Sequence, residues 1–153
     1  MDLRAKLQAA TKDAMKARDG TRLSALRLIS AAIKDREIAM RGGDGDGELT
    51  DADLVAILSK MVKQRQESAK AYEEGGRLEL AEKEQAEIAI IQEFLPRQLD
   101  EAETAAAIDS AIADLGATGI RDMGRVMAEL RHRHAGQMDF GAVGPMVKTR
   151  LLG

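Results

Sequence analysis

The sequence predicts an all-α protein, with a helical N-terminal domain that contains an antiparallel helix hairpin and a small tail domain of three helices. Three observations support this fold class. Good helix formers, chiefly Ala, Leu, Glu, Lys, Arg and Met, dominate the 153 residues. Apolar residues recur at helical spacing in one segment after another, and only two prolines interrupt them. Glycines or capping residues such as aspartate and threonine separate these segments.

The central segment, Lys60–Leu99, is expected to form the hairpin, which turns at Gly75-Gly76 and stops at Pro96. Each of its two helices carries an apolar stripe, and each stripe contains one charge. These charges are Arg65 on the first helix and Glu84 on the second. Because a lone buried charge is very unfavourable, we predict a structural ion pair between them. A role for the pair in a functional site is the alternative.

Two helices precede the hairpin, at about Asp2–Arg18 and Thr21–Arg41, with a break at Asp19-Gly20. Arg22 and Arg36 fall on the apolar side of the second helix. They either extend from the edge of the core with their charges in water or are held for a ligand.

The glycine- and aspartate-rich residues 42–48 are expected to form a flexible loop. They do not match a calcium-binding loop, because Leu49 replaces the required glycine and Val55 the closing glutamate. Thr50 and Asp53 then resemble a capping box, which starts the first helix of the hairpin.

A domain boundary is expected at Pro96, since proline cannot continue a helix, and it divides the chain into residues 1–96 and 97–153. The tail should contain three helices, the first capped by Asp100, the second at about Arg121–His134 and the third capped by Asp139. Pro145 is expected in the first turns of the last helix, where proline is best tolerated.

Composition excludes several classes of protein. The chain has no cysteine, and therefore no disulfide framework, thiolate metal site or thiol nucleophile. No apolar run approaches the ~20 residues of a membrane span, and the first residues lack the apolar core of a signal peptide. We therefore expect a cytoplasmic protein with no membrane partner.

Charge is unevenly distributed, although the net charge is only −3. Residues 1–41 carry ten basic and five acidic side chains, residues 42–99 seven and thirteen, and residues 100–153 six and eight. Within the last segment, residues 116–153 hold six basic and three acidic side chains. Two basic ends thus flank an acidic middle, which indicates either ordinary solvated helix faces or a bipartite surface for an anionic partner.

No catalytic group of residues is visible. His132 and His134 stand two residues apart on an expected helix, so they point in different directions and cannot share a metal ion. The serines lie within expected helices and lack a suitably placed histidine base. We expect no cofactor, no metal and no self-contained active site, while an acid–base pair assembled from distant helices stays open.

Nucleic-acid binding is favoured over catalysis. The candidate phosphate-contacting residues are Arg22, Arg27 and Lys34 in the first domain and Arg121, Arg125 and Arg133 in the tail. Only 2% of the residues are aromatic, which argues against stacking on single-stranded bases and favours a folded RNA. The alternative is that these cations serve only to keep the protein in solution.

Several motifs resemble those of the YqeY family. They are Lys63-Gln64-Arg65, Gly75-Gly76-Arg77, Phe94-Leu95-Pro96-Arg97-Gln98-Leu99 and Asp122-Met123-Gly124-Arg125-Val126-Met127. The likeness covers essentially the whole chain. YqeY proteins are similar to the C-terminal region of GatB, a subunit of the glutamine-dependent tRNA amidotransferase, which is a carbon–nitrogen ligase with glutamine as amido-N-donor.

The resemblance implies an accessory protein that binds folded tRNA and works beside an amidotransferase or an aminoacyl-tRNA synthetase. In GatB, amide transfer occurs in a separate N-terminal cradle, and nothing in this chain corresponds to it. The resemblance therefore supplies no active site. A helical protein–protein interaction module with no nucleic-acid role is the alternative, and an enzyme in its own right is a third hypothesis.

Overall fold

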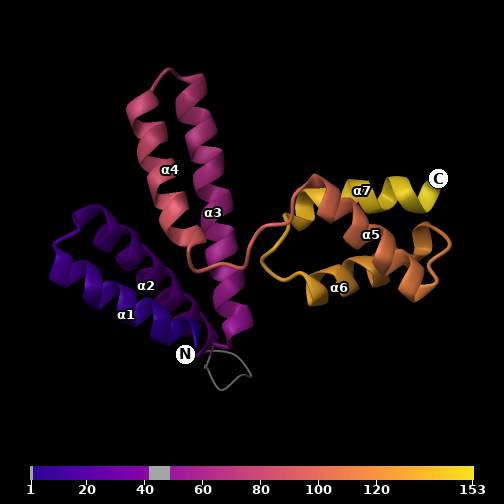
Figure 1. Cartoon of the computed structure of the whole chain (residues 1–153), viewed down its shortest axis with the longest axis horizontal. Helices are drawn as coiled ribbons and strands as arrows, with labels where there is room; N and C mark the ends of the chain where they lie inside the picture. Colours follow the sequence, from indigo (N-terminus) through magenta and orange to yellow (C-terminus); the bar gives the residue numbers. More distant parts are fainter. Residues whose placement is uncertain (1, 42–48) are drawn as a thin grey trace. The chain divides into compact units, whose positions relative to one another are not determined.

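The computed structural model describes residues 2–41 and 49–153. Within these ranges it contains seven α-helices, one short 3-10 helix and no strand, which confirms the predicted all-α class (Figure 1). The glycine-rich loop expected at residues 42–48 lies outside the described residues. The chain divides into two compact units, Met1–Leu95 and Pro96–Gly153.

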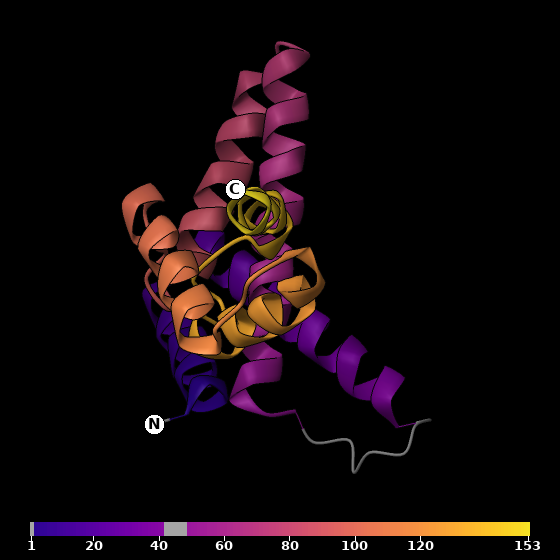
Figure 2. The same cartoon turned by 90° about the vertical axis from the view of Figure 1, so that its right-hand side faces the viewer.

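The first unit consists of α1 (Leu3–Ala17), α2 (Gly20–Met40), α3 (Asp51–Glu74) and α4 (Leu78–Gln92). In both views, α1 lies along α2, and α3 and α4 form a long hairpin whose far end extends beyond the first two helices (Figures 1 and 2). The inner sides of all four helices form one core. Its most deeply buried large side chains are Leu26, Ile29, Leu54, Leu58 and Ile91.

Local side chains define the helix starts of this unit. Asp19 lies at the expected break between the first two helices and caps α2, because its carboxylate accepts a hydrogen bond of 3.1 Å from the amide of Arg22. Gly20 consequently begins the helix. The expected capping box at Thr50 and Asp53 is present, with the two reciprocal bonds at 2.9 and 3.2 Å. The backbone amide of Thr50, and also its hydroxyl, donate to the Asp53 carboxylate and lower its pKa.

The charge pair inside the hairpin differs from the one predicted. Arg65 pairs with Glu87, not with Glu84: its Nε lies 3.0 Å from a Glu87 carboxylate oxygen. Arg65 stands nine residues before the last residue of α3, and Glu87 stands nine residues after the first residue of α4. Residues at equal distances from the turn face each other in an antiparallel hairpin. Glu84 is only six residues into α4, so it lies nearer the turn than Arg65 does.

The second unit consists of α5 (Glu101–Leu115), η1 (Ile120–Asp122), α6 (Met123–Arg133) and α7 (Phe140–Leu152). Its core is separate from that of the first unit and centres on Ile108, Ala111, Val126, Leu130 and Val147, which are all fully buried. The helix expected from Arg121 thus begins with a 3-10 turn. Pro145 is the sixth residue of α7, further into the helix than its first turn.

Candidate nucleic-acid interface

One side of α2 carries exposed cations and hydroxyl groups along most of its length. At 100° per residue, nine residues of Gly20–Arg41 lie within about 60° of Arg27 around the helix axis. Of these, Gly20 has no side chain and Leu23 is half-buried against the core. The other seven have exposed side chains, and they are Ser24, Arg27, Ser30, Ala31, Lys34, Ile38 and Arg41. We call this set the α2 cationic face. It contains no carboxylate, although α2 itself includes Asp35 and Glu37, which point to either side of it.

Three cations form a row along this face. Arg27, Lys34 and Arg41 follow each other at intervals of seven residues, which places successive Cα atoms roughly 10 Å apart along the helix axis. Arg41 occupies the C-cap but keeps helical backbone angles, φ −62° and ψ −23°. Within the part of the chain that the structure describes, none of the three has a hydrogen-bond or ion-pair partner for its side chain. Their charges are therefore available to an external anion.

Arg22, the third candidate in the first unit, is engaged inside the protein. Its Nη1 lies 2.7 Å from Oε2 of Glu93, and its guanidinium lies over the ring of Phe94, 5.9 Å from the ring centre. Both partners follow the last residue of α4. Arg22 thus ties the first turn of α2 to the end of the hairpin, and a phosphate would have to compete with Glu93 for it.

The candidate arginines of the second unit also differ in whether an acidic side chain already binds them. Arg133 bonds to Glu129 at 2.7 Å and to Asp114 at 3.0 Å, and the pKa of its guanidinium is raised mainly by the bond to Glu129. Arg125 pairs with Asp122 at 3.1 Å. The pKa of this aspartate is lowered, first by the amide of Thr118 and also by Arg125.

Arg121 is the candidate of this unit that the structure leaves unpaired among the described residues, and it is exposed on η1. Arg131 is not among the predicted candidates. Its guanidinium lies over the ring of Phe140, 5.7 Å from the ring centre. Among the described residues, the second unit therefore leaves one of its three candidate arginines without an acidic partner.

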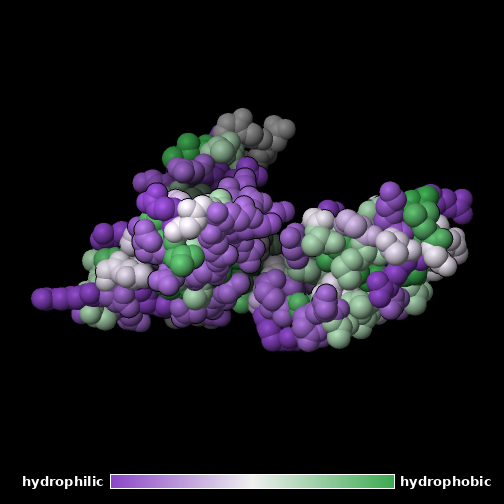
Figure 3. Space-filling view, turned by 90° about the horizontal axis from the view of Figure 1, so that it is seen from above, coloured by the Kyte–Doolittle hydropathy of each residue, from purple (hydrophilic) through white to green (hydrophobic). Residues whose placement is uncertain are grey.

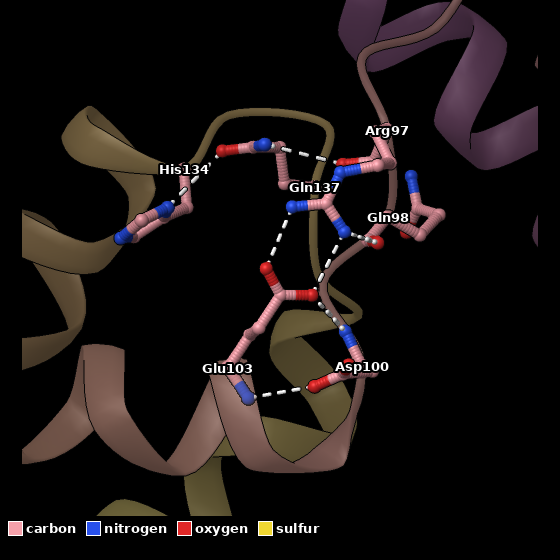
Figure 4. A network of polar contacts seen from close by, with 6 residues as sticks. All are labelled: Arg97, Gln98, Asp100, Glu103, His134 and Gln137. Atoms are coloured by element: carbon pink, nitrogen blue, oxygen red, sulfur yellow. Dashed lines mark hydrogen bonds and ion pairs between the residues drawn. The ribbon is translucent and has the colours of Figure 1, made fainter.

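A bidentate ion pair joins the segment before α5 to the first turn of that helix (Figure 4). The guanidinium of Arg97 donates to both carboxylate oxygens of Glu103, at 2.8 and 2.6 Å. Glu103 also forms a capping box with Asp100 at the first turn of α5. The bond from Arg97, followed by the amide of Asp100, lowers the pKa of Glu103 to about 2.

Amide side chains join the same segment to the loop between α6 and α7 (Figure 4). Gln98 donates to the carbonyl of Gly136 at 2.5 Å, and Gln137 donates to the carbonyl of Arg97 at 3.1 Å. The amide of Leu99 donates in turn to the carbonyl of Gln137 at 2.9 Å. This network satisfies backbone groups on both segments, so we interpret it as architecture of the second unit.

Residues 2–41 and 49–153 contain no cluster of three or more His, Cys, Asp or Glu side chains that could hold a metal ion. His132 is exposed, while Nδ1 of His134 lies 3.1 Å from Oε1 of Gln137. No helix in the same ranges is long and apolar enough to cross a membrane.

Sequence reasoning found Arg27 and Lys34 but missed the other members of the α2 cationic face. The signal was present in the printed sequence. Arg41 continues the seven-residue spacing of Arg27 and Lys34, and the serines at positions 24 and 30 fall on the same side. What the pattern could not supply was the exposure of that side, which depends on how α2 packs against the other helices.

Comparison with known proteins finds relatives that share the name "Altered inheritance of mitochondria protein 41, mitochondrial". The relative from Eremothecium gossypii is 34% identical over 98% of this chain and 81% of its own length. The relative from Lachancea thermotolerans is 32% identical over 75% of this chain and 60% of its own length. One from Saccharomyces cerevisiae is 34% identical over 58% of this chain and 46% of its own length.

The names of these relatives contradict the cytoplasmic location that we expected for this chain. That expectation used the composition and the first few residues alone. Neither feature bears on the compartments named for the relatives, so we withdraw it.

The family model described as Yqey-like protein matches residues 4–151, which is nearly the entire chain and includes both units. The match spans every motif on which the resemblance to that family was based. Together with the full-length similarity to the Eremothecium gossypii protein, it shows that the chain belongs to the YqeY family.

Proposed function

We propose that this YqeY-family chain is an accessory protein that binds folded tRNA and works beside a glutamine-dependent amidotransferase or an aminoacyl-tRNA synthetase. The observation that carries the proposal is the α2 cationic face, with two hydroxyl groups and three cations that have no partner among the described residues. Arg, Lys and Ser are among the side chains that contact phosphate oxygens in complexes with nucleic acids.

The aromatic residues support a folded RNA over an unstructured one. Tyr72, Phe94 and Phe140 are the only aromatic residues of the chain. All three are half-buried, and the two phenylalanine rings already lie beneath arginine guanidiniums. Unpaired bases would therefore find no aromatic platform on which to stack. The contacts would go to the backbone of a folded RNA.

The resemblance of the YqeY family to the C-terminal region of GatB supports tRNA as the folded RNA and an amidotransferase as the neighbouring enzyme. In this proposal the chain contributes binding and the enzyme contributes the chemistry. No residue of the chain is assigned a catalytic role.

The surface favours this function over a helical protein–protein interaction module. Hydrophilic residues cover most of the first unit in the view of Figure 3. The large exposed apolar side chains of this unit are Met15, Leu28, Ile38 and Leu78, and they lie on different parts of three helices. Apolar residues scattered singly in this way are normal on protein surfaces and do not indicate a docking patch.

Titration of the purified chain with an unmodified tRNA transcript tests the proposal, with an unstructured RNA of the same length as control. Measurements at two salt concentrations separate phosphate contacts from other contributions. We expect a preference for the tRNA and an affinity that falls steeply with salt. Equal binding of both RNAs, or none, contradicts the proposal and favours the protein-interaction alternative. Co-elution with a purified amidotransferase, with and without nuclease treatment, then tests whether the chain works beside that enzyme.

A further inference from the structure

The chemistry of the α2 cationic face suits the sugar–phosphate backbone better than the edges of bases. The face offers two guanidiniums, one ammonium and two hydroxyls, and it has no Asn, Gln, Asp or Glu. Asn and Gln read adenine and the acidic residues read cytosine, and the face has none of these. Arg and Lys read guanine in the major groove, but the major groove of double-helical RNA is too deep and narrow for side chains to read. The cations and hydroxyls of the face are therefore left to contact phosphates and sugars, which position a nucleic acid without reading its sequence.

The geometry of the face suits a rigid ligand. The opposite side of α2 carries Leu26, Ile29 and Ile33, which are all buried in the core of the first unit. This packing fixes the first part of α2 against the core, and the helical rise spaces the backbone positions of Arg27, Lys34 and Arg41 over about 20 Å of the helix axis. A double helix presents its phosphates at fixed positions to such a row, whereas a flexible single strand loses conformational freedom to follow it.

The second unit is less suited to the same task, because carboxylates already hold most of its arginines. Arg125, Arg133 and Arg150 pair with acidic side chains at 3.1, 2.7 and 2.5 Å. A phosphate that binds one of these arginines must displace a carboxylate, so part of the favourable interaction is offset. Arg27, Lys34 and Arg41 have no carboxylate partner in residues 2–41 and 49–153, so a phosphate would displace none there.

From these three observations we infer that the α2 cationic face binds the backbone of double-helical RNA, independently of sequence, and supplies most of the salt-dependent affinity of the chain. This inference rests on the proposed function and makes it more specific. The ligand class is a paired RNA stem, and the residues that contact it are Arg27, Lys34 and Arg41, with Ser24 and Ser30 beside them.

The test compares two triple variants of the full chain that change the net charge equally. The first carries Arg27→Gln, Lys34→Gln and Arg41→Gln on the face. The control carries Lys60→Gln, Lys70→Gln and Lys83→Gln, three exposed residues of α3 and α4. Glutamine is a good helix former, so both variants should fold, and circular dichroism checks this. The probes are an RNA duplex of about 16 base pairs and one of its strands, chosen not to pair with itself.

We expect the unmodified chain to prefer the duplex. The slope of log affinity against log salt should become shallower by about 0.9 for each phosphate that a variant no longer neutralises, hence by nearly 3 for the face variant. The control should change the slope by less than 1. Each single face variant should contribute about one third of the full effect, and the triple variant Arg27→Lys, Lys34→Arg and Arg41→Lys should keep the slope.

Three results would overturn the inference: an equal change of slope in the control, an unchanged slope in the face variant, or equal binding of the single strand and the duplex. These outcomes differ from failure of the proposed function. If tRNA does not bind at all, the proposed function fails. If tRNA binds but the face variant keeps the original salt dependence, the assignment to α2 fails and tRNA binding stands.

Discussion

Arg65 and Glu87 form a largely buried ion pair across the α3–α4 hairpin, with 3.0 Å between Nε and Oε2 and side-chain exposures of 15% and 13%. Arg65 also donates to the carbonyl of Met61 at 3.3 Å. Below the pair, towards the core, large apolar side chains such as Leu58 and Ile91 join the two helices. Beyond it, towards the turn, the buried positions are occupied by the small residues Ala69 and Ala81. The pair therefore lies at the boundary between the large buried side chains on its core side and the small ones on its turn side.

Replacement of Arg65 by methionine should destabilise the chain, because it leaves the Glu87 carboxylate without its partner. Fully buried pairs lose 3–5 kcal/mol in this way, and the residual exposure here suggests about 2 kcal/mol. The double variant Arg65→Met, Glu87→Leu should recover most of this loss, while Arg65→Met, Glu84→Leu should not. Urea unfolding of all variants measures both effects, and strictly additive losses at Arg65 and Glu87 would show that the pair does not interact energetically.

Substitution of Ser59 by alanine should stabilise the first unit. Its Oγ is buried and has no hydrogen-bond partner among the described residues. Removal of an unsatisfied hydroxyl and the better helix propensity of alanine should together raise the unfolding free energy by about 1 kcal/mol. Ser68→Ala, at an exposed position of the same helix, should gain only the propensity contribution, about half as much. Equal gains at both positions in urea unfolding would refute the role of the buried hydroxyl.

Replacement of Arg18 by glycine should also stabilise the chain. Arg18 is the non-glycine residue with positive φ in the described ranges, at 55°, and it closes the C-terminal end of α1. A left-handed conformation costs a residue with a side chain about 1–2 kcal/mol, and glycine avoids most of that strain. We expect a gain of about 1 kcal/mol in thermal or urea unfolding. Lys16→Gly, within the helix, serves as the opposite control and should lose about the same amount. A loss at both positions would mean that the Arg18 side chain stabilises the fold.

The ion pair between Arg97 and Glu103 should make the second unit sensitive to acid. The folded-state pKa of Glu103, about 2, lies below its usual value of 4.5. The stabilisation is therefore complete above the usual pKa and is lost as the pH falls from about 4.5 towards 2. Glu103→Gln should be less stable than the unmodified chain at neutral pH, and the difference should shrink over that interval. Hydrogen exchange of the α5 amides in both full-length chains measures this, and a difference independent of pH would contradict it.

Sequence reasoning succeeded where structure is decided by neighbouring residues. The capping box at Thr50–Asp53 and the N-cap of α5 at Asp100 involve residues three positions apart, so the order of residues reveals them. The ion pair of the hairpin was missed because register depends on the length of the turn. α3 ends at Glu74 and α4 begins at Leu78, which places Glu87 instead of Glu84 opposite Arg65.

The candidate interface likewise has features that the sequence shows and features that only tertiary packing decides. The charges of Arg27 and Lys34 and the lack of nearby acids on that side of α2 are visible in the sequence. The engagement of Arg133 by Asp114 is not visible, because the two residues lie nineteen positions apart and meet only when α5 packs against α6. Whether an arginine is free for a ligand thus depends on tertiary contacts that composition and spacing do not contain.

The most direct test of tRNA binding is the affinity of a single tRNA transcript for three full-length chains at the same low salt concentration. These are the unmodified chain, the variant with glutamine at positions 27, 34 and 41, and the variant with glutamine at positions 60, 70 and 83. We expect tight binding by the first and third chains and an affinity at least tenfold weaker for the second. Equal affinities for all three chains, or no binding beyond that of an unstructured RNA, would contradict tRNA binding through the α2 cationic face.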